Sequence, residues 1–388
     1  MGVLRQGYAD HGRRPMNALR SFAARADIET ILAGLGAARI DVPVLQPADP
    51  FLDMAGEELR RRIFVTQSET GEALCLRPEF TIPVCRDHVA AGGGPARYGY
   101  VGTVFRQRRA GPSEFLQAGI EDIGATDTVA ADARSVADAA AVLERLGVVA
   151  DDRAIVIGDQ TVFDAVLAEL GLPAGWRLTL AHAFGSDAAL AATLERLGRP
   201  APMPAMPEAI AEPARAGDRA ALEEAISAQM RAASLPGTGG RTAADIAGRL
   251  LAKVEAARLA PDPARLDALR AFLAIAVPLQ NAPDALAAWQ STAGLDLAAA
   301  IAAFGARIEA LEGHGLDPGA IVYRASFGRQ LDYYTGLVFE MRGADGAVLA
   351  GGGRYDRLLP LLGAPHPTPG VGFSVWLDRV AAVAGDAP

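Results

Sequence analysis

One predicted strand places an amide and a carboxylate side by side. In FLQAGIEDIG, the two-residue period of a strand puts Phe115, Gln117, Gly119 and Glu121 on one face. A face that carries Gln, Gly and Glu is a poor core and a suitable floor for a polar pocket. The alternative is that this face is simply exposed to water.

A second polar group lies in LRPEFTIPVCR, where a predicted strand ends and a helix begins. Arg77, Glu79, Thr81 and Arg86 bring cations and hydrogen-bond acceptors close together there. A helix cap with a solvated salt bridge would explain the same residues. Taken alone, the segment favours that simpler interpretation.

A third group lies in GRQLDYYTGLVFE and the following AGGGRYDRLL. Arg329, Tyr333 and Tyr334 offer one cation and two phenols. Gly351 to Gly353 would let the backbone approach a ligand, but the triplet lacks the spacing and the Lys of a phosphate-binding P-loop. Its spacing predicts a hairpin loop.

The sequence predicts neither a metal site nor a cofactor site. Cys75 and Cys85 are ten residues apart, with no CxxC pair and no His at ligand spacing, which is typical of reduced thiols in a cytoplasmic protein. No 19-residue window is apolar enough to span a membrane, and the N-terminus lacks the apolar core of a secretory signal. We therefore expect a soluble protein without membrane association.

Helices and strands alternate in the first 165 residues. A helix is predicted from Met16 to about Gly36, before the β-rich ARIDVPVLQP. The elements predicted after it are a hairpin of 63–67 and 72–78, a helix over 80–91, an antiparallel pair of strands in ARYGYVGTVFRQR and SEFLQAGIEDIG, a helix from Thr126 or Asp127 to Leu146, and a strand over 153–159.

The middle of the chain has a different composition. Ala, Leu, Glu and Arg dominate residues 166–315, and Pro and Gly divide this stretch into helix-length pieces. Strand patterns return in IVYRASF, GLVFEMR, AVLAGG and GVGFSVW. The sequence therefore predicts an α+β domain formed by residues 1–165 and 316–388, with a helical insertion over 166–315.

Composition and charge limit the function. With 51% hydrophobic and 21% charged residues, the chain has the apolar content of a globular protein. Its formal net charge of -9 argues against a main role in nucleic-acid binding, because binding to phosphates requires many Lys and Arg residues. We therefore do not expect tRNA as a partner.

Taken in order, these segments resemble the class II aminoacyl-tRNA synthetases, and their histidine branch in particular. RPEFT resembles RPEGT, FR followed by EFLQAGIEDIG resembles the second class II motif, and RQLDYYTGLVFE resembles RGLDYYTGTVFE of histidyl-tRNA synthetases. GGGRYDRL with GVGFSVWLDR resembles the third motif, and IDVPVLQP, around Pro43, resembles the first, dimer-forming motif. The resemblance covers about 28–158 and 322–383 and implies the class II fold, an antiparallel sheet flanked by helices.

The same resemblance implies a histidine pocket. The residues that it assigns are Glu79, Thr81 and Gln117 to the α-ammonium group, Glu121 and Tyr334 to the imidazole, Arg106 and Arg329 to the carboxylate, and Tyr333 as a further pocket residue. The chemistry is consistent, because a zwitterion needs acceptors at one end and a fixed cation at the other. An imidazole also needs an acceptor that selects its tautomer.

The departures from the family pattern fall on its other substrates. Arg108 stands where the family has a Glu that contacts adenine, and the loop between FR and EF is about three residues shorter than in the family. Trp376 replaces a small glycine beside the adenine, and only nine residues follow the third motif, so no anticodon-binding domain of ~90 to 100 residues is expected. ATP binding, tRNA binding and catalytic residues are therefore not expected.

This combination resembles the synthetase paralogues that act as regulatory subunits of short-form ATP phosphoribosyltransferases. It implies a non-catalytic chain that activates a separate catalytic subunit in the first step of histidine biosynthesis and binds histidine for feedback inhibition. The implied partners are L-histidine, a second copy of the chain through the face that carries Pro43, and the catalytic subunit in a hetero-octamer with four of each chain.

Three alternatives stay open at this point. They are a synthetase-like enzyme that forms histidyl-adenylate, a stand-alone histidine-binding paralogue, and a structural dimer with a vestigial pocket. The last is disfavoured because a disused pocket has no need for buried polar groups such as Gln117 and Glu121, which are costly without partners.

Overall fold

The computed structural model describes residues 25–54, 57–109, 111–199, 203–233, 242–258, 262–329 and 333–384. The helix predicted from Met16 begins outside these residues and is described as α2 (Arg25–Gly34). Two compact units form within the chain. Unit 1 consists of Met1–Phe163, Ala274–Ala288 and Ala298–Pro388, and unit 2 consists of Asp164–Leu273 and Trp289–Leu297.

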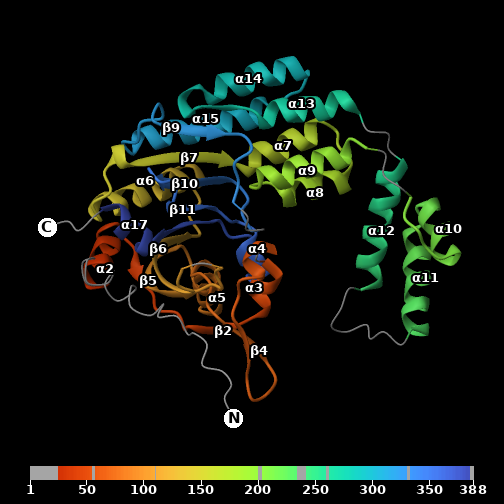
Figure 1. Ribbon diagram of the computed structural model, residues 1–388, viewed down its shortest axis with the longest axis horizontal. Helices are drawn as coiled ribbons and strands as arrows, with labels where there is room; N and C mark the ends of the chain where they lie inside the picture. The colour runs from red at the N-terminus through yellow and green to blue at the C-terminus, as the bar shows by residue number, and fades with distance from the viewer. Residues whose placement is uncertain are drawn as a thin grey trace, which may run out of the picture. The chain divides into compact units, whose positions relative to one another are not determined.

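Unit 1 is built around a nine-stranded sheet (Figure 1). In spatial order its strands are β1 (Ala38–Arg39), β5 (Ala96–Phe105), β6 (Glu114–Ile123), β12 (Gly370–Trp376), β11 (Val348–Arg354), β10 (Leu337–Gly343), β7 (Arg153–Asp159), β9 (Ile321–Arg324) and β8 (Ala276–Pro278). The pairs β1–β5 and β7–β9 are parallel, and the other pairs are antiparallel. Three strands from the C-terminal part of the chain thus lie between β6 and β7, so distant segments complete one sheet, as the sequence predicts.

Helices lie on the two faces of this sheet. The predicted cap is confirmed at α6 (Thr128–Arg145), where the Asp127 side chain accepts a hydrogen bond of 3.0 Å from the Ala130 amide. Helix α6 packs against β11 and β12, and α15 (Ala298–Gly313) packs against α6. The other helices of unit 1 include α5 (Thr81–Ala90), α16 (Leu358–Leu361) and α17 (Leu377–Ala384), while α14 (Ala282–Ala293) spans the boundary with unit 2.

A second, small sheet has the order β2-β4-β3. Its strands are β2 (Leu45–Pro47), β4 (Ala73–Leu76) and β3 (Val65–Gln67), with α3 (Asp49–Met54) and α4 (Glu57–Arg60) between β2 and β3. Strands β3 and β4 pair antiparallel, which confirms the predicted hairpin. Val44, Leu45 and Val65, on or beside this sheet, are exposed large hydrophobic residues.

The glycine triplet is part of a central strand, so the predicted hairpin loop at Gly351 to Gly353 is wrong. All three lie in β11, where close neighbours leave no room for a side chain. A Cβ at Gly351 would lie 1.9 Å from Nη1 of Arg329, and one at Gly352 would lie 2.0 Å from the carbonyl oxygen of Gly372. Glycine is needed here for close approach and not for a turn.

Unit 2 is helical. Its helices are α8 (Ala174–Ala183), α9 (Asp187–Leu197), α10 (Glu208–Ala216), α11 (Arg219–Ala232), α12 (Ala243–Arg258) and α13 (Pro263–Leu273), while α7 (Gln160–Glu169) spans the boundary. Helices α10 to α12 share a core of their own around Leu222 and Ile226. Residues 274–288 and 298–315, predicted within the insertion, group with unit 1, where β8 pairs with β9. A three-residue strand has no period of its own, so only tertiary pairing reveals it.

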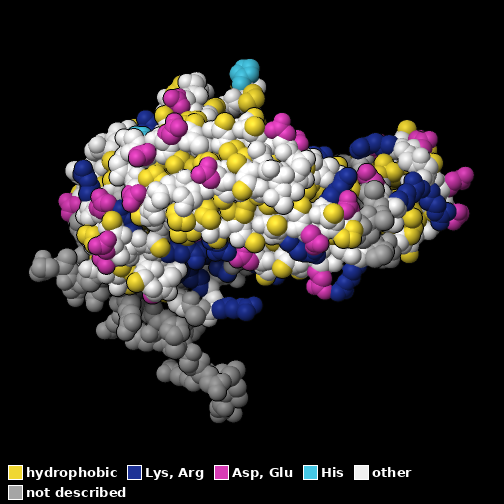
Figure 2. Space-filling view, turned by 90° about the horizontal axis from the view of Figure 1, so that it is seen from above, with side chains coloured by type: hydrophobic (Ala, Val, Ile, Leu, Met, Phe, Trp, Pro, Cys, Tyr) yellow, Lys and Arg dark blue, Asp and Glu magenta, His cyan; other side chains and the backbone are white. Residues whose placement is uncertain are grey.

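Charge is unevenly distributed over the surface. On the face drawn in Figure 2, Lys and Arg side chains lie in several separate groups, although the whole chain has a formal net charge of -9. The acidic balance therefore does not describe every part of the surface. No helix among the described residues is long and apolar enough to cross a membrane.

Candidate functional site

The floor of the candidate site is one face of β5, β6 and β12. Gln117 lies directly opposite Trp376 on one side and Gly102 on the other, and Glu121 lies opposite Gly372. Residues directly opposite one another in an antiparallel pair point to the same face. Phe115, Gln117 and Glu121 are 3%, 0% and 1% exposed, so the alternative of a water-exposed face is wrong.

Three hydroxyl groups surround the Glu121 carboxylate. Thr81 Oγ1 donates to Oε1 over 2.7 Å, Tyr355 OH donates to Oε2 over 2.5 Å, and Tyr100 OH lies 3.4 Å from Oε1. Burial raises the pKa of Glu121 to about 8, although these hydrogen bonds favour the carboxylate. A Cβ at Gly372 would lie 1.9 Å from Oε2, so glycine in β12 makes room for this carboxylate.

Glu79 caps the start of a helix from a buried position. Its carboxylate accepts hydrogen bonds from the amides of Thr81 (2.7 Å) and Ile82 (3.0 Å), at the first turn of α5. It is nevertheless buried, and burial raises its pKa, so it is not a solvated cap. Because each carboxylate oxygen can accept more than one hydrogen bond, Glu79 can still accept one from a ligand.

Gln117 is the most unusual polar group of the site. It is fully buried, yet neither Oε1 nor Nε2 has a hydrogen-bond partner among the described residues. Leaving a buried polar group unpaired costs about 1–3 kcal/mol. The side chain is therefore suited to a bound molecule that both donates and accepts hydrogen bonds.

Two arginines supply positive charge. Arg106 Nε donates to the carbonyl oxygen of Pro78 (2.7 Å), and burial lowers the pKa of Arg106 to about 10 while Glu79 acts in the opposite direction. Arg329 Nη1 lies 3.1 Å from Oε1 of Glu340, and Arg329 Nε has no hydrogen-bond partner in the described part of the chain. Both guanidinium groups remain cations at neutral pH and can attract a carboxylate.

Aromatic rings form the rest of the wall. The Tyr333 ring lies 5.0 Å from that of Tyr334 and 6.1 Å, edge-on, from that of Tyr355. Tyr333 and Tyr355 are buried in the core cluster that also contains Phe115, with Tyr334 packed against it. The eight residues predicted from the sequence thus lie around one floor, from β6, the segment before α5 and its first residue, the segment after β5 and the segments before β10.

The residues that depart from the synthetase pattern also have packed positions. Trp376 is 5% exposed and belongs to the same core cluster, with the guanidinium carbons of Arg329 and Arg379 at 5.7 Å and 5.1 Å from its ring. The Arg108 guanidinium carbon lies 3.8 Å from the Phe115 ring centroid. The indole therefore fills space beside Gln117.

Sequence reasoning missed two hydroxyl groups of the site. Tyr355 and Tyr100 both approach Glu121, and Tyr100 OH is also 2.8 Å from Oγ of Ser374. Tyr355 follows directly on the glycine-rich strand of GGGRYD, and that position was the available signal. No cluster of three or more metal-ligating side chains suits a metal ion within the described ranges.

Comparison with known proteins places the chain in a family. The sequence profile described as Histidyl-tRNA synthetase matches residues 11–265 and 247–380. A protein of Mesorhizobium japonicum named ATP phosphoribosyltransferase regulatory subunit is 53% identical over 368 residues, which cover 94% of this chain and 98% of that protein.

Solved structures show the same fold. One, described as an ATP phosphoribosyltransferase regulatory subunit/histidyl-tRNA synthetase from Bacillus halodurans, has a TM-score of 0.62 at 19% identity and covers 99% of this chain and 84% of its own. Histidyl-tRNA synthetase from Nostoc has a TM-score of 0.59 at 16% identity, covering 95% and 71%. The predicted class II synthetase-like α+β fold is thus confirmed, and the chain belongs to the family of ATP phosphoribosyltransferase regulatory subunits.

Proposed function

We propose that this chain binds L-histidine in the pocket above β6 and transmits feedback inhibition to a separate catalytic subunit of ATP phosphoribosyltransferase. In this proposal the chain is itself non-catalytic. It activates a short-form catalytic subunit that joins ATP to a phosphoribosyl group in the first step of histidine biosynthesis. The name of the 53% identical relative supports the regulatory role.

The observation that carries the proposal is the unpaired amide of Gln117. Oε1 needs a donor and Nε2 needs an acceptor, and the two atoms lie in a fully buried position. An α-amino acid has both an ammonium donor and a carboxylate acceptor. A bound amino acid would therefore offset the cost of this side chain.

The surrounding charges favour histidine among amino acids. Glu79 and Glu121 provide acceptors, while Arg106 and Arg329 provide cations. Glu121 is surrounded by hydroxyl groups that can reorient, so one of its oxygens can accept a hydrogen bond from an imidazole N–H group and thereby fix the tautomer of the histidine ring. An aliphatic amino acid would leave this carboxylate facing an apolar side chain, at a cost in affinity.

The non-catalytic part of the proposal rests on Trp376. By resemblance this position lies beside the adenine of the synthetases, and here a buried indole fills it. Because interiors are packed with few voids, a nucleotide could bind only if the indole moved. We propose that adenylate is therefore not formed.

Feedback inhibition requires histidine to distinguish two states of a complex. A ligand shifts an equilibrium only by binding one state more tightly than the other. We propose a cytoplasmic hetero-octamer of four regulatory and four catalytic chains. Two regulatory chains would pair through the face that carries Pro43, beside the exposed Val44, Leu45 and Val65.

Calorimetric titration with L-histidine tests the proposal, with two matched glutamine variants. Gln117→Met removes the unpaired amide and should weaken histidine binding by at least about tenfold, since each hydrogen bond to a charged group contributes about 1.5–3 kcal/mol. Gln46→Met removes another buried amide, one that is already bonded to Pro43 and Arg86, and should leave the affinity unchanged. Equal affinities in the two variants would contradict the site.

Titration with ATP and magnesium separates the proposal from a synthetase. We expect no ATP binding and no histidine-dependent pyrophosphate exchange. Either activity would establish an enzyme that forms histidyl-adenylate. Failure to alter the activity of the catalytic subunit, despite histidine binding, would instead indicate a stand-alone binding protein.

A further inference from the structure

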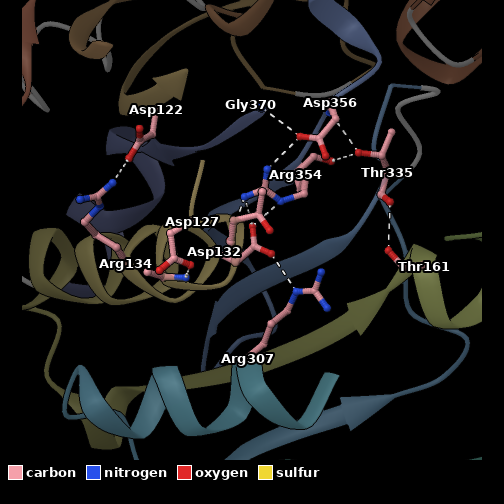
Figure 3. A network of polar contacts seen from close by, with 12 residues as sticks. Asp122, Asp127, Asp132, Arg134, Thr161, Arg307, Thr335, Arg354, Asp356 and Gly370 are labelled. Atoms are coloured by element: carbon pink, nitrogen blue, oxygen red, sulfur yellow. Dashed lines mark hydrogen bonds and ion pairs between the residues drawn. The ribbon is translucent and has the colours of Figure 1, made fainter. Parts of the chain in front are cut away.

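Three buried charged side chains meet on the α6 face of the sheet. Arg354, from β11, contacts Oδ1 of Asp132 through Nε and Nη2, each at 2.7 Å (Figure 3). Arg307, from α15, donates to Oδ2 of the same carboxylate over 2.9 Å. The side chains of Asp132, Arg354 and Arg307 are 0%, 4% and 11% exposed. One carboxylate therefore holds two guanidinium groups from different elements.

A second path leads from Arg307 back to Arg354. Arg307 Nη1 lies 3.6 Å from Oδ2 of Asp159, whose Oδ1 accepts from the Thr161 amide over 2.7 Å. Thr161 Oγ1 donates to the Thr335 carbonyl over 3.2 Å, as Figure 3 also shows. The Thr335 amide donates to the Arg354 carbonyl over 2.8 Å. These contacts close a circuit, the charge ring, formed by Arg354, Asp132, Arg307, Asp159, Thr161 and Thr335.

The charge ring touches the candidate site at two points of the chain. Arg354 directly precedes Tyr355, which donates to Glu121. Thr335 directly follows Tyr334. Because the side chain of Arg354 points to the α6 face, the next residue, Tyr355, can reach the opposite face, where Glu121 lies. Fixing Arg354 and Thr335 thus fixes the backbone beneath two tyrosines of the pocket.

We infer that Asp132 and Arg307 are positioning residues for the ligand pocket, acting through Arg354 and Thr335 on Tyr355 and Tyr334. This inference rests on the proposed binding of histidine. The affinity for histidine would then depend on α15, although Arg307, the α15 residue in the charge ring, does not itself line the pocket. Any movement of α15 would therefore change the pocket through Asp132.

A purely structural role would have a different consequence. A buried ion pair that only stabilises the fold changes the free energy of unfolding when it is broken, with no preference for one loop. In the charge ring, by contrast, the Thr335 amide is hydrogen-bonded to Arg354 of β11 and the Thr335 carbonyl to Thr161 of α7. Breaking the ring should therefore loosen residues 333–336 first.

The test compares two aspartates of the same helix. Asp132→Asn preserves the size of the side chain but removes the negative charge that pairs with Arg354 and Arg307. Asp138→Asn does the same to a buried aspartate of α6 whose partner is Arg97 of β5, away from residues 333–336. We expect Asp132→Asn to weaken histidine binding about tenfold or more and to speed amide exchange at Thr335, and Asp138→Asn to change neither beyond about twofold.

Each outcome has one meaning. If the wild-type chain binds no histidine, the proposed function fails, and exchange at Thr335 still decides whether the charge ring positions this loop. If the wild type binds histidine and folded Asp132→Asn matches it in affinity and exchange, the inference is overturned. Equal effects of both aspartate variants would also overturn it.

A milder variant serves if Asp132→Asn does not fold. Thr161→Val removes only the hydroxyl that reaches the Thr335 carbonyl, at an exposed position. We expect affinity to fall about two- to fivefold, as for one hydrogen bond. Thr30→Val, which removes an exposed helix hydroxyl bonded to Ala26, is the control and should have no effect. Unchanged affinity and exchange in Thr161→Val would overturn the inference.

Discussion

The two faces of the central strands differ in whether their buried polar side chains have hydrogen-bond partners. On the α6 face, both oxygens of Asp132 are bonded to arginines. On the pocket face, the amide of Gln117 has no partner, and neither does Nε of Arg329, among the residues described. The Asp132 carboxylate is therefore fully paired and the Gln117 amide is not, although Oδ2 of Asp159 in the charge ring has an ion contact of 3.6 Å with Arg307 and no hydrogen bond among the residues described.

This difference suits the α6 face to a structural role and the pocket face to ligand binding. Most buried polar groups in proteins are hydrogen-bonded, so the rare exceptions require an explanation. The paired charges hold α6, α15 and β11 together, whereas the unpaired groups lower stability unless a ligand completes them. Substitutions on the α6 face should therefore change folding most, and substitutions on the pocket face should change binding most.

The largest expected effect is on the paired face. Asp132→Ala leaves Arg354 and Arg307 buried without their shared carboxylate, and should lower the free energy of unfolding by about 3–5 kcal/mol. Urea denaturation measures this loss. A change below about 1 kcal/mol would show that the charge ring is not a scaffold and would remove the contrast between the faces.

A steric substitution on the pocket face should have the next largest effect. The Cβ of Gly372→Ala would lie 1.9 Å from Glu121 Oε2 and 2.7 Å from the Ile120 carbonyl, so the carboxylate or the strand must move. We expect a loss of about 2–3 kcal/mol together with loss of histidine binding. Gly305→Ala in α15 is the control, because nothing lies within 4 Å of its Cβ and the helix should gain about 1 kcal/mol.

The pH dependence of stability sharpens the comparison at Glu121. Burial raises the pKa of this group from its ordinary value of 4.5 to about 8, so the folded chain keeps a proton that the unfolded chain releases. Its contribution to stability is therefore present below about pH 4.5 and is lost as the pH rises towards 8. Glu121→Gln should remove about 3–4 kcal/mol of this decline between pH 5 and 8, as measured by urea denaturation. Parallel pH profiles of the two proteins would contradict a buried, protonated Glu121.

Local patterns predicted the elements that lie next to one another in sequence. The alternation in FLQAGIEDIG placed Phe115, Gln117 and Glu121 on one face, and β6 has them there. The Asp127 cap was also correct, because capping depends on residues three positions apart.

Long-range register accounts for what the sequence missed. Tyr355 and Glu121 are 234 residues apart, and they meet only because β11, β12 and β6 are neighbours. Gly351 has no left-handed backbone and is required by the Arg329 side chain, so the glycine triplet alone could not distinguish a loop from a crowded strand. The helix-cap interpretation of Glu79 and its assignment to the pocket coexist because one carboxylate can serve both.

The smallest change in stability should come from Gln117, the residue on which the proposed binding of histidine rests. Gln117→Met replaces an amide whose two polar atoms are unpaired, so the free energy of unfolding should change by less than about 1 kcal/mol or should rise. Gln46→Met should instead lose about 1–3 kcal/mol, because it deprives Arg86 and the Pro43 carbonyl of their partner. Thermal or urea denaturation without histidine measures the pair. If Gln117→Met were the less stable of the two, its amide would already be satisfied in the free protein, and the contrast with the fully paired Asp132 carboxylate would disappear.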